Sequence, residues 1–114
     1  MPYLNRYEIN SLIKNGSIKS SAIISKKQLQ PASLDLTLSS NCYRIKASFI
    51  PNNIPVSLIL KDLTLTKINL KNGFLLEKGC IYLCELNEQF NLPKKIRGKS
   101  NPKSTTGRLD IFTR

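Results

Sequence analysis

The stretch PASLDLTLSSNCYRIK, residues 31–46, determines the fold that we expect for this chain. Within it, residues 34–38 alternate leucine with polar side chains, which is the pattern of a half-buried β-strand. The Ser-Ser-Asn sequence at residues 39–41 predicts a turn that leads into a second strand, CYRIK, at residues 42–46. The stretch therefore predicts β structure.

Three further runs continue the β pattern: IPVSLIL at residues 54–60, DLTLTKINL at 62–70 and CIYLCEL at 80–86. Segments rich in proline, glycine and charge lie between them, at residues 51–55 and 77–79, and are expected to break the strands. The apolar positions change phase within residues 62–70, which predicts a β-bulge or an intervening turn there.

One helix is expected near the N-terminus, over residues 6–16. Asn5 can cap its first turn, apolar residues recur at helical spacing over residues 9–13, and Gly16 is a plausible stop. Helical periods are missing between the later strands, which argues against a parallel α/β sheet. We therefore expect a mainly β, antiparallel fold with a short N-terminal helix, as a single domain over residues 1–114.

The composition restricts the class of protein. The chain has 114 residues with 18 Lys and Arg against 7 Asp and Glu, a formal net charge of +11. Residues 94–114 hold seven of the basic side chains and one acidic side chain, which predicts an anionic partner: nucleic acid, a membrane surface or a phosphorylated small molecule. Biased genome composition explains the whole-chain charge equally well.

No apolar run reaches the ~18 residues of a membrane span, and the N-terminus lacks the basic-then-apolar order of a signal peptide. We therefore expect a cytoplasmic protein that does not associate with a membrane.

Histidine is absent, which excludes Ser-His-Asp and Cys-His catalysis and zinc sites that need imidazole, including those of the zinc-dependent nucleobase deaminases. The three cysteines are Cys42, Cys80 and Cys84, and none has the C-x-x-C spacing. Strand alternation would place Cys80 and Cys84 on one face but too far apart to pair. We expect free thiols in or near the core.

The segment with the clearest chemical pattern is RGKSNPKSTTGRLD, residues 97–110. After Pro102 breaks the preceding strand, residues 103–106 supply an ammonium, three hydroxyls and four backbone N–H groups. If Ser104 opens a short helix, its free N–H groups favour an anion, and Arg108 would lie over the same spot one turn later. The pattern predicts a phosphate site that is not a P-loop. A solvated basic turn with a Ser/Thr cap is the alternative.

Two separated motifs resemble one family. QPASLDL at residues 30–36, together with NPKSTTGRLDIFTR at residues 101–114, is similar to dCTP deaminase of the dUTPase superfamily, in particular to the long bacterial form with two dUTPase-like halves. The N-terminal helix, the Tyr-Arg-Ile strand at residues 43–45 and the Leu-Pro at residues 92–93 occur in that family in the same order. The resemblance runs over about residues 8–114.

The resemblance implies a distorted antiparallel β-barrel of the dUTPase type, here incomplete, and a zinc-independent hydrolase that converts dCTP to dUTP and ammonia. A glutamate would act as general base on the water that attacks C4 of cytosine. Mg²⁺ would accompany the triphosphate, with no metal held by the protein alone. The implied partner, besides dCTP, is a second copy in a trimer-like homo-oligomer or a second repeat of the same chain.

The motif residues carry over by position. Lys103 stands where the family often has a basic phosphate contact. Ser104 and Arg108 take the catalytic positions associated with the reacting water and the phosphates, and Thr105 would add a phosphate-binding hydroxyl and N–H. The implied substrate-binding residues are therefore Lys103, Ser104, Thr105 and Arg108.

Three carboxylates are expected to have other roles. Asp35 matches the acidic residue of the first motif, and we expect it to tie down a turn by hydrogen bonding rather than to act in catalysis. Glu85 and Glu88 are expected to be exposed strand residues with no link to the general base.

The chain departs from the family in one respect: the catalytic glutamate of the family lies downstream of the Ser/Arg motif, and no residue follows Arg114. Residues 110–114 also look like the start of a strand. We therefore expect a truncated sequence that is inactive alone and folds poorly for lack of pairing strands. The alternatives are a dUTPase and, from another class, a small basic nucleic-acid-binding module. The segment offers few aromatic platforms for base stacking, which disfavours nucleic acid.

Overall fold

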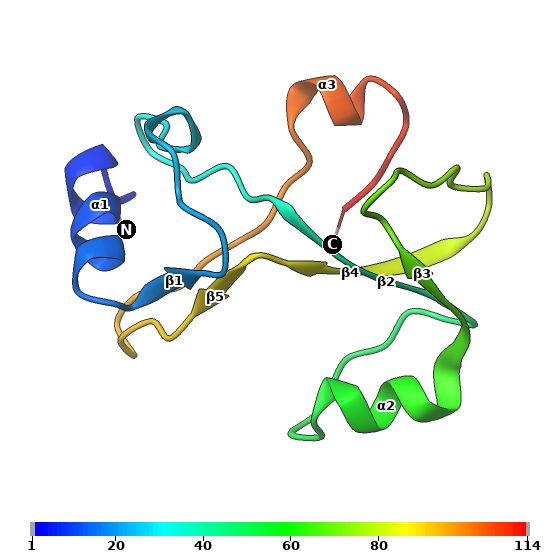
Figure 1. The fold of residues 1–114 in the computed structure, drawn as a ribbon. Helices are drawn as coiled ribbons and strands as arrows, with labels where there is room; N and C mark the ends of the chain where they lie inside the picture. Colours follow the sequence, from blue (N-terminus) through cyan, green and yellow to red (C-terminus); the bar gives the residue numbers. More distant parts are fainter. Residues whose placement is uncertain (1, 114) are drawn as a thin grey trace.

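The structure is a computed structural model that describes residues 2–113, which form two small antiparallel sheets and a few short helices (Figure 1). In chain order the elements are α1 (Arg6–Lys14), β1 (Ile18–Ser20), the 3-10 turn η1 (Lys26–Gln28), β2 (Leu38–Ile45), α2 (Val56–Leu63), β3 (Thr64–Asn69), β4 (Ile81–Leu86), β5 (Glu88–Phe90) and α3 (Ser104–Gly107). None of the helices in residues 2–113 is long and apolar enough to cross a membrane.

Helix α1 forms as its sequence predicts. The side chain of Asn5 accepts a hydrogen bond of 3.0 Å from the backbone N–H of Glu8, which satisfies one of the free donors of the first turn. Ile9 and Leu12 are buried on the inner face of the helix. After the helix, Gly16 adopts a φ of +83°, a left-handed conformation that a side chain would disfavour.

The strands belong to two sheets joined by one extended segment. The larger sheet has the order β3-β2-β4 and the smaller one pairs β1 with β5, and all pairings are antiparallel. Strand β4 passes through Asn87 directly into β5, so the segment 81–90 contributes to both sheets (Figure 1). The expected mainly β antiparallel fold with an N-terminal helix is confirmed. The described strands form two separate sheets and do not close into a barrel.

The first predicted strand and turn are wrong in their bounds. Residues 34–37 lie outside β2, and Leu34 forms only an isolated bridge with Leu29. Residues 39–41 continue the strand, because the irregularity that predicted a turn is absorbed as a register shift of β2 against β4 between Leu38 and Cys42.

The predicted strand at residues 54–60 is also wrong, because α2 occupies most of it. Its half-buried residues, Ile59, Leu60 and Leu63, recur at helical spacing, and Pro55 stands at the N-cap with its fixed φ of −56°. The predicted bulge in the following strand is confirmed. Arg44 pairs with Thr66 and Ile45 with Thr64, so Leu65 between them is the extra residue.

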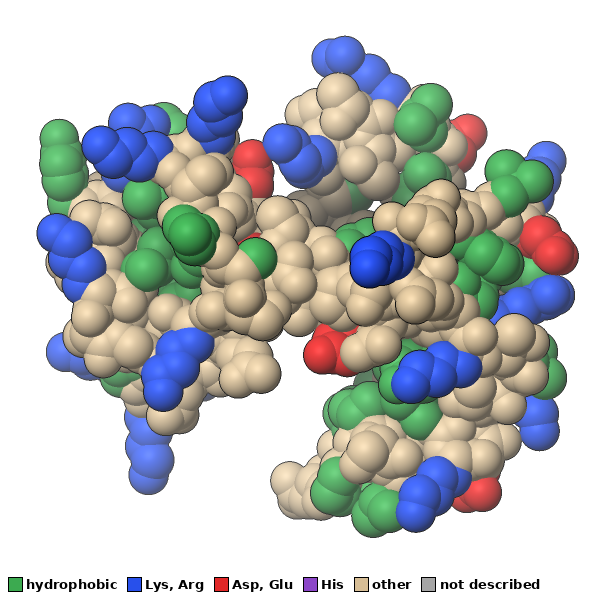
Figure 2. Space-filling view, in the orientation of Figure 1, with side chains coloured by type: hydrophobic (Ala, Val, Ile, Leu, Met, Phe, Trp, Pro, Cys, Tyr) green, Lys and Arg blue, Asp and Glu red, His purple; other side chains and the backbone are tan. Residues whose placement is uncertain are grey.

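The core of the described residues is small. Six apolar residues are buried: Ile9, Leu12, Ile18, Cys42, Ile45 and Ile68. Many large apolar side chains remain on the surface, such as Ile23 at 96% exposure and Leu75 at 87%, and Figure 2 shows hydrophobic side chains over both halves of the visible face. The radius of gyration is 15.4 Å, against about 13 Å for a compact domain of this length. The fold is therefore open.

Residues 110–113 do not form the strand that their sequence suggested, and they follow α3 as turn and irregular backbone. Asp110 has a φ of +57°, which ends any extended run at its first residue. Arg114, the last residue of that predicted strand, lies outside the described residues.

Candidate functional site

The first motif folds into a closed turn that precedes β2. Leu29 and Leu34 form an antiparallel bridge, and the backbone N–H of Gln30 donates to the carbonyl of Ser33 at 3.0 Å. The N–H of Asp35 donates to the carbonyl of Gln28 at 2.8 Å. These backbone bonds hold residues 28–35 as one unit and fix the position from which the Asp35 side chain projects.

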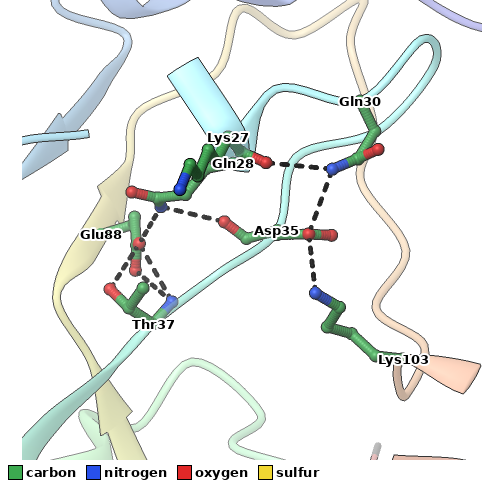
Figure 3. A network of polar contacts seen from close by, with 7 residues as sticks. All are labelled: Lys27, Gln28, Gln30, Asp35, Thr37, Glu88 and Lys103. Carbon is green, nitrogen blue, oxygen red and sulfur yellow. Dashed lines mark hydrogen bonds and ion pairs between the residues drawn. The ribbon is translucent and has the colours of Figure 1, made fainter. Parts of the chain in front are cut away.

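Asp35 connects the two motifs. Its Oδ2 accepts a hydrogen bond of 3.3 Å from Nε2 of Gln30 and one of 3.0 Å from Nζ of Lys103, which stands 68 residues later in the chain (Figure 3). The Asp35 side chain is 23% exposed and that of Lys103 is 65% exposed, so the ion pair lies at the surface with its carboxylate partly covered. Asp35 thus ties down its own turn, as expected, and also anchors the start of α3.

Behind Asp35 lies a buried carboxylate, Glu88, at 4% exposure. It accepts hydrogen bonds from the backbone N–H of Thr37 at 3.0 and 3.1 Å, from the Thr37 hydroxyl at 2.8 Å and from Nε2 of Gln28 at 3.0 Å. The same amide of Gln28 also donates to the carbonyl of Asp35 at 3.0 Å, so the network runs from β5 to the first motif (Figure 3). The expectation that Glu88 is exposed is therefore wrong, whereas Glu85 is exposed as expected.

Glu88 is buried because it lies where the two sheets meet. Its β5 position pairs with Ser20 of β1, and its side chain fills the space beside Thr37, where the chain has left the turn and not yet entered β2. Asn87 completes this junction, since its Nδ2 donates to the Thr37 hydroxyl and to the carbonyl of Leu38. Sequence reasoning missed Gln28, Thr37, Asn87 and Glu88 as a group, because no local pattern shows that these positions meet.

The second motif forms the short helix α3, with Lys103 at its N-cap. The N–H of Gly107 donates to the Lys103 carbonyl at 2.8 Å and that of Arg108 to the Ser104 carbonyl at 3.0 Å. These bonds confirm that Ser104 opens a helix and that Arg108 follows it by one turn. The helix has only 4 residues.

The four side chains of the second motif that were predicted to bind phosphate are exposed. Ser104, Thr105 and Arg108 are exposed in the structure, and their side chains form no hydrogen bond with any residue from 2 to 113. Figure 2 shows Lys and Arg side chains over the α3 end of the molecule. The structure therefore brings Lys103, Ser104, Thr105 and Arg108 together on one short segment, with hydroxyl and guanidinium donors that solvent or an anion can reach.

Two grooves of the described residues lie away from this segment. One has a volume of about 500 Å³ and is lined by residues of β2, the loop after β3 and Cys84. The other, of about 170 Å³, lies between Gly16 and Asn91 beside the smaller sheet. The second motif thus offers an exposed face rather than either of these grooves.

A comparison with protein families identifies the fold. The model of the 2'-deoxycytidine 5'-triphosphate deaminase (DCD) N-terminal domain matches residues 2–114. The chain belongs to this family. The resemblance that the two motifs indicated is therefore confirmed, and with it membership of a family of enzymes.

A solved structure agrees with this assignment. The crystal structure of 2'-deoxycytidine 5'-triphosphate deaminase from Agrobacterium tumefaciens is 43% identical in sequence and superposes with a TM-score of 0.90. The match covers 96% of this chain and 33% of that chain, so the present sequence spans about a third of the length of this relative. A search of curated proteins gives no match.

Proposed function

We propose that this chain supplies the triphosphate-binding part of a dCTP deaminase, which hydrolyses the 4-amino group of dCTP to give dUTP and ammonia. The ion pair between Asp35 and Lys103 carries this proposal, because it joins at one place on the surface the two motifs on which the resemblance to the family rests. A basic turn without such a function would need no fixed partner in the first motif.

Four residues of the second motif have a chemical role in this proposal. Lys103 and Arg108 supply positive charge for the phosphate oxygens, and the guanidinium can bind two oxygens at once. The hydroxyls of Ser104 and Thr105 donate hydrogen bonds to the same anion. Asp35 has a positioning role. Its carboxylate accepts a hydrogen bond of 3.0 Å from the Lys103 ammonium and so holds the N-cap residue of α3 in place.

Deamination also needs a general base that removes a proton from the attacking water, so that hydroxide adds to C4 and ammonia leaves. Ser104 and Arg108 would orient that water and the base. Glu88 cannot be the base, because it is buried and its oxygens are already occupied by Gln28 and Thr37. Residues 109–114 contain no glutamate. We therefore propose that the second motif binds the nucleotide and that the base is a residue other than Glu88.

The proposal includes magnesium as the companion of the triphosphate. Residues 2–113 contain no cluster of three or more carboxylate, thiol or imidazole groups that could hold a metal ion. In this proposal the ion would be held mainly by phosphate oxygens and water, where it would offset phosphate charge. The proposed setting is the cytoplasm, with a site completed by a second copy or a second repeat. The open core and the exposed apolar side chains support such a contact.

The reaction can be tested with the complete gene product by measuring ammonia release from dCTP with Mg²⁺. We expect Ser104→Ala and Arg108→Ala each to lower kcat by about 100-fold, because each removes a group that orients the reacting centre. The thermal midpoint should not change, since both side chains are exposed. Lys99→Ala is the matched control, because Lys99 is an exposed cation of the same segment without an assigned role.

Two outcomes would overturn the proposal. Release of pyrophosphate from dUTP without ammonia release from dCTP would indicate a dUTPase, in which water attacks phosphorus. Tight, steeply salt-dependent binding of single-stranded DNA, with no preference for dCTP in a calorimetric titration, would indicate a nucleic-acid-binding module. Wild-type turnover in both alanine variants would show that the site residues are assigned wrongly.

A further inference from the structure

Two cysteines that have no part in the proposed function lie opposite each other in the larger sheet. Cys42 of β2 and Cys84 of β4 are directly paired across the antiparallel strands, and their Sγ atoms are 3.4 Å apart. Residues opposite each other in antiparallel strands have Cα atoms about 4.5 to 5.5 Å apart and point to the same face. Disulfides need Cα separations of about 4.4 to 6.8 Å, so this pair can be bridged without moving a strand.

The two thiols differ in their access to solvent. Cys42 lies on the central strand between Ile68 and Cys84 and has no exposed surface. Cys84 is half-buried and lines the open groove of about 500 Å³, together with Phe74 and Lys71. A small reagent can therefore reach Cys84 from the groove, whereas Cys42 lies behind it.

Burial raises the pKa of Cys42 from 9.0 to about 11, and the neighbouring Cys84 is the second cause of this increase. Cys42 thus keeps its proton at neutral pH and is a poor first nucleophile. Its closeness to Cys84 favours it instead as the group that reacts second, within the protein.

We propose that Cys84 and Cys42 form a peroxide-sensitive dithiol, in which Cys84 is oxidised first and Cys42 closes the disulfide. The Cys84 sulfur attacks a hydroperoxide, its S–O bond forms as the O–O bond breaks, and the alcohol or water leaves with the proton. The Cys42 sulfur then attacks the sulfenic sulfur. The S–S bond forms, the S–O bond breaks, and hydroxide leaves with the Cys42 proton as water. Two thiols lose two electrons, and one peroxide gains them.

The third cysteine is excluded as a partner. Cys80 accepts a hydrogen bond of 3.1 Å from the guanidinium of Arg44, which also pairs with Glu77 at 3.5 Å. It stands four residues before Cys84, which is about 13 Å along an extended strand and beyond the reach of a disulfide. Cys80 therefore serves as an internal control.

The test treats the folded 114-residue chain with hydrogen peroxide and measures free thiols, intact mass and linked peptides. We expect the free thiols to fall from three to one, the mass to fall by about 2 Da, and digestion to give one linked pair, Cys42 with Cys84. Because the bridge closes a long loop of the unfolded chain, the oxidised form should melt about 5 to 10 °C higher, and dithiothreitol should reverse the shift.

Variants separate the two steps. Cys84→Ser should form no disulfide, and Cys80→Ser should form the bridge as the wild type does. Cys42→Ala should stop at a sulfenic or sulfinic acid on Cys84, which a mass gain reports even if this variant is less stable. A link between Cys80 and Cys84, or in the wild type a stable sulfinic acid on Cys84 without any disulfide, would overturn the proposal.

Discussion

Polar side chains have opposite environments in two regions of the molecule. One region is the junction where the two sheets meet, and the other is the α3 segment. At the junction, the buried carboxylate of Glu88 is fully engaged by Thr37 and Gln28. On α3, the hydroxyl of Ser104 and the guanidinium of Arg108 are exposed and bond to no other side chain of residues 2–113. One ion pair, Asp35 with Lys103, connects the two regions.

This difference separates residues that build the fold from residues that are available to a ligand. A buried charge is tolerated only when its hydrogen-bonding capacity is used, so the donors of the junction have no capacity left for a substrate. Exposed donors lose little by exchanging water for phosphate. The comparison therefore predicts that changes at the junction affect stability, whereas changes on α3 affect binding.

The largest effect is expected from Glu88→Ala. The change removes a buried carboxylate and leaves the N–H of Thr37 and the half-buried amide of Gln28 without their charged acceptor, which should cost about 2 kcal/mol or more of unfolding free energy. Urea denaturation measures the loss. Glu85→Ala is the control, because Glu85 is exposed and accepts a single hydrogen bond from Asn41, and it should stay within about 0.5 kcal/mol of the wild type. Equal losses in the two variants would contradict the distinction.

A smaller effect is expected from the titration of the buried thiol in the larger sheet. The pKa of Cys42 is raised to about 11 in the folded state, so above pH 9 the unfolded chain releases this proton before the folded chain does. Below about pH 9, Cys42 makes its full contribution to the free energy of unfolding. As the pH rises toward 11, that free energy falls by about 2 kcal/mol.

The measurement compares unfolding free energies at pH 8.5 and pH 10.5 in the presence of dithiothreitol, which keeps the thiols reduced. Cys42→Ala should show a loss smaller than that of the wild type by about 2 kcal/mol, whereas Cys80→Ala should match the wild type. The same alkaline loss in all three proteins would mean that other groups carry the pH dependence.

Sequence patterns predicted the parts of the fold that depend on neighbouring residues. Asn5 and Gly16 bounded α1 correctly, because a cap and a left-handed stop are local features. The strand prediction for residues 54–60 is wrong, since aliphatic residues there fit a strand as well as a helix, and the half-burial of Ile59 and Leu63 at helical spacing decides between them.

The candidate site was predictable only in part for the same reason. The second motif could be recognised as one segment, because Lys103, Ser104 and Arg108 are close in sequence. Its partner could not, since Asp35 and Lys103 are 68 residues apart and meet only in the tertiary structure. The sequence predicts Glu88 to be an ordinary exposed strand residue, because its burial depends on Thr37, 51 residues away.

The smallest and most local effect is expected from Asp35→Asn, which breaks the ion pair between the two regions. Asparagine keeps the shape of the side chain and removes the charge that holds Lys103. Because Lys103 is 65% exposed, the ion pair should contribute less than about 1 kcal/mol to global stability. The effect should instead appear as faster hydrogen exchange at the amides of Gly107 and Arg108, by about three- to fivefold, with β2 and β4 unchanged. Asp110→Asn, a change of the same kind at an exposed position beyond α3, should leave the exchange rates of those amides unchanged.

If exchange instead rises equally in the sheet and in α3, then Asp35 supports the whole fold and not the second motif in particular. The division between the two regions would then be wrong.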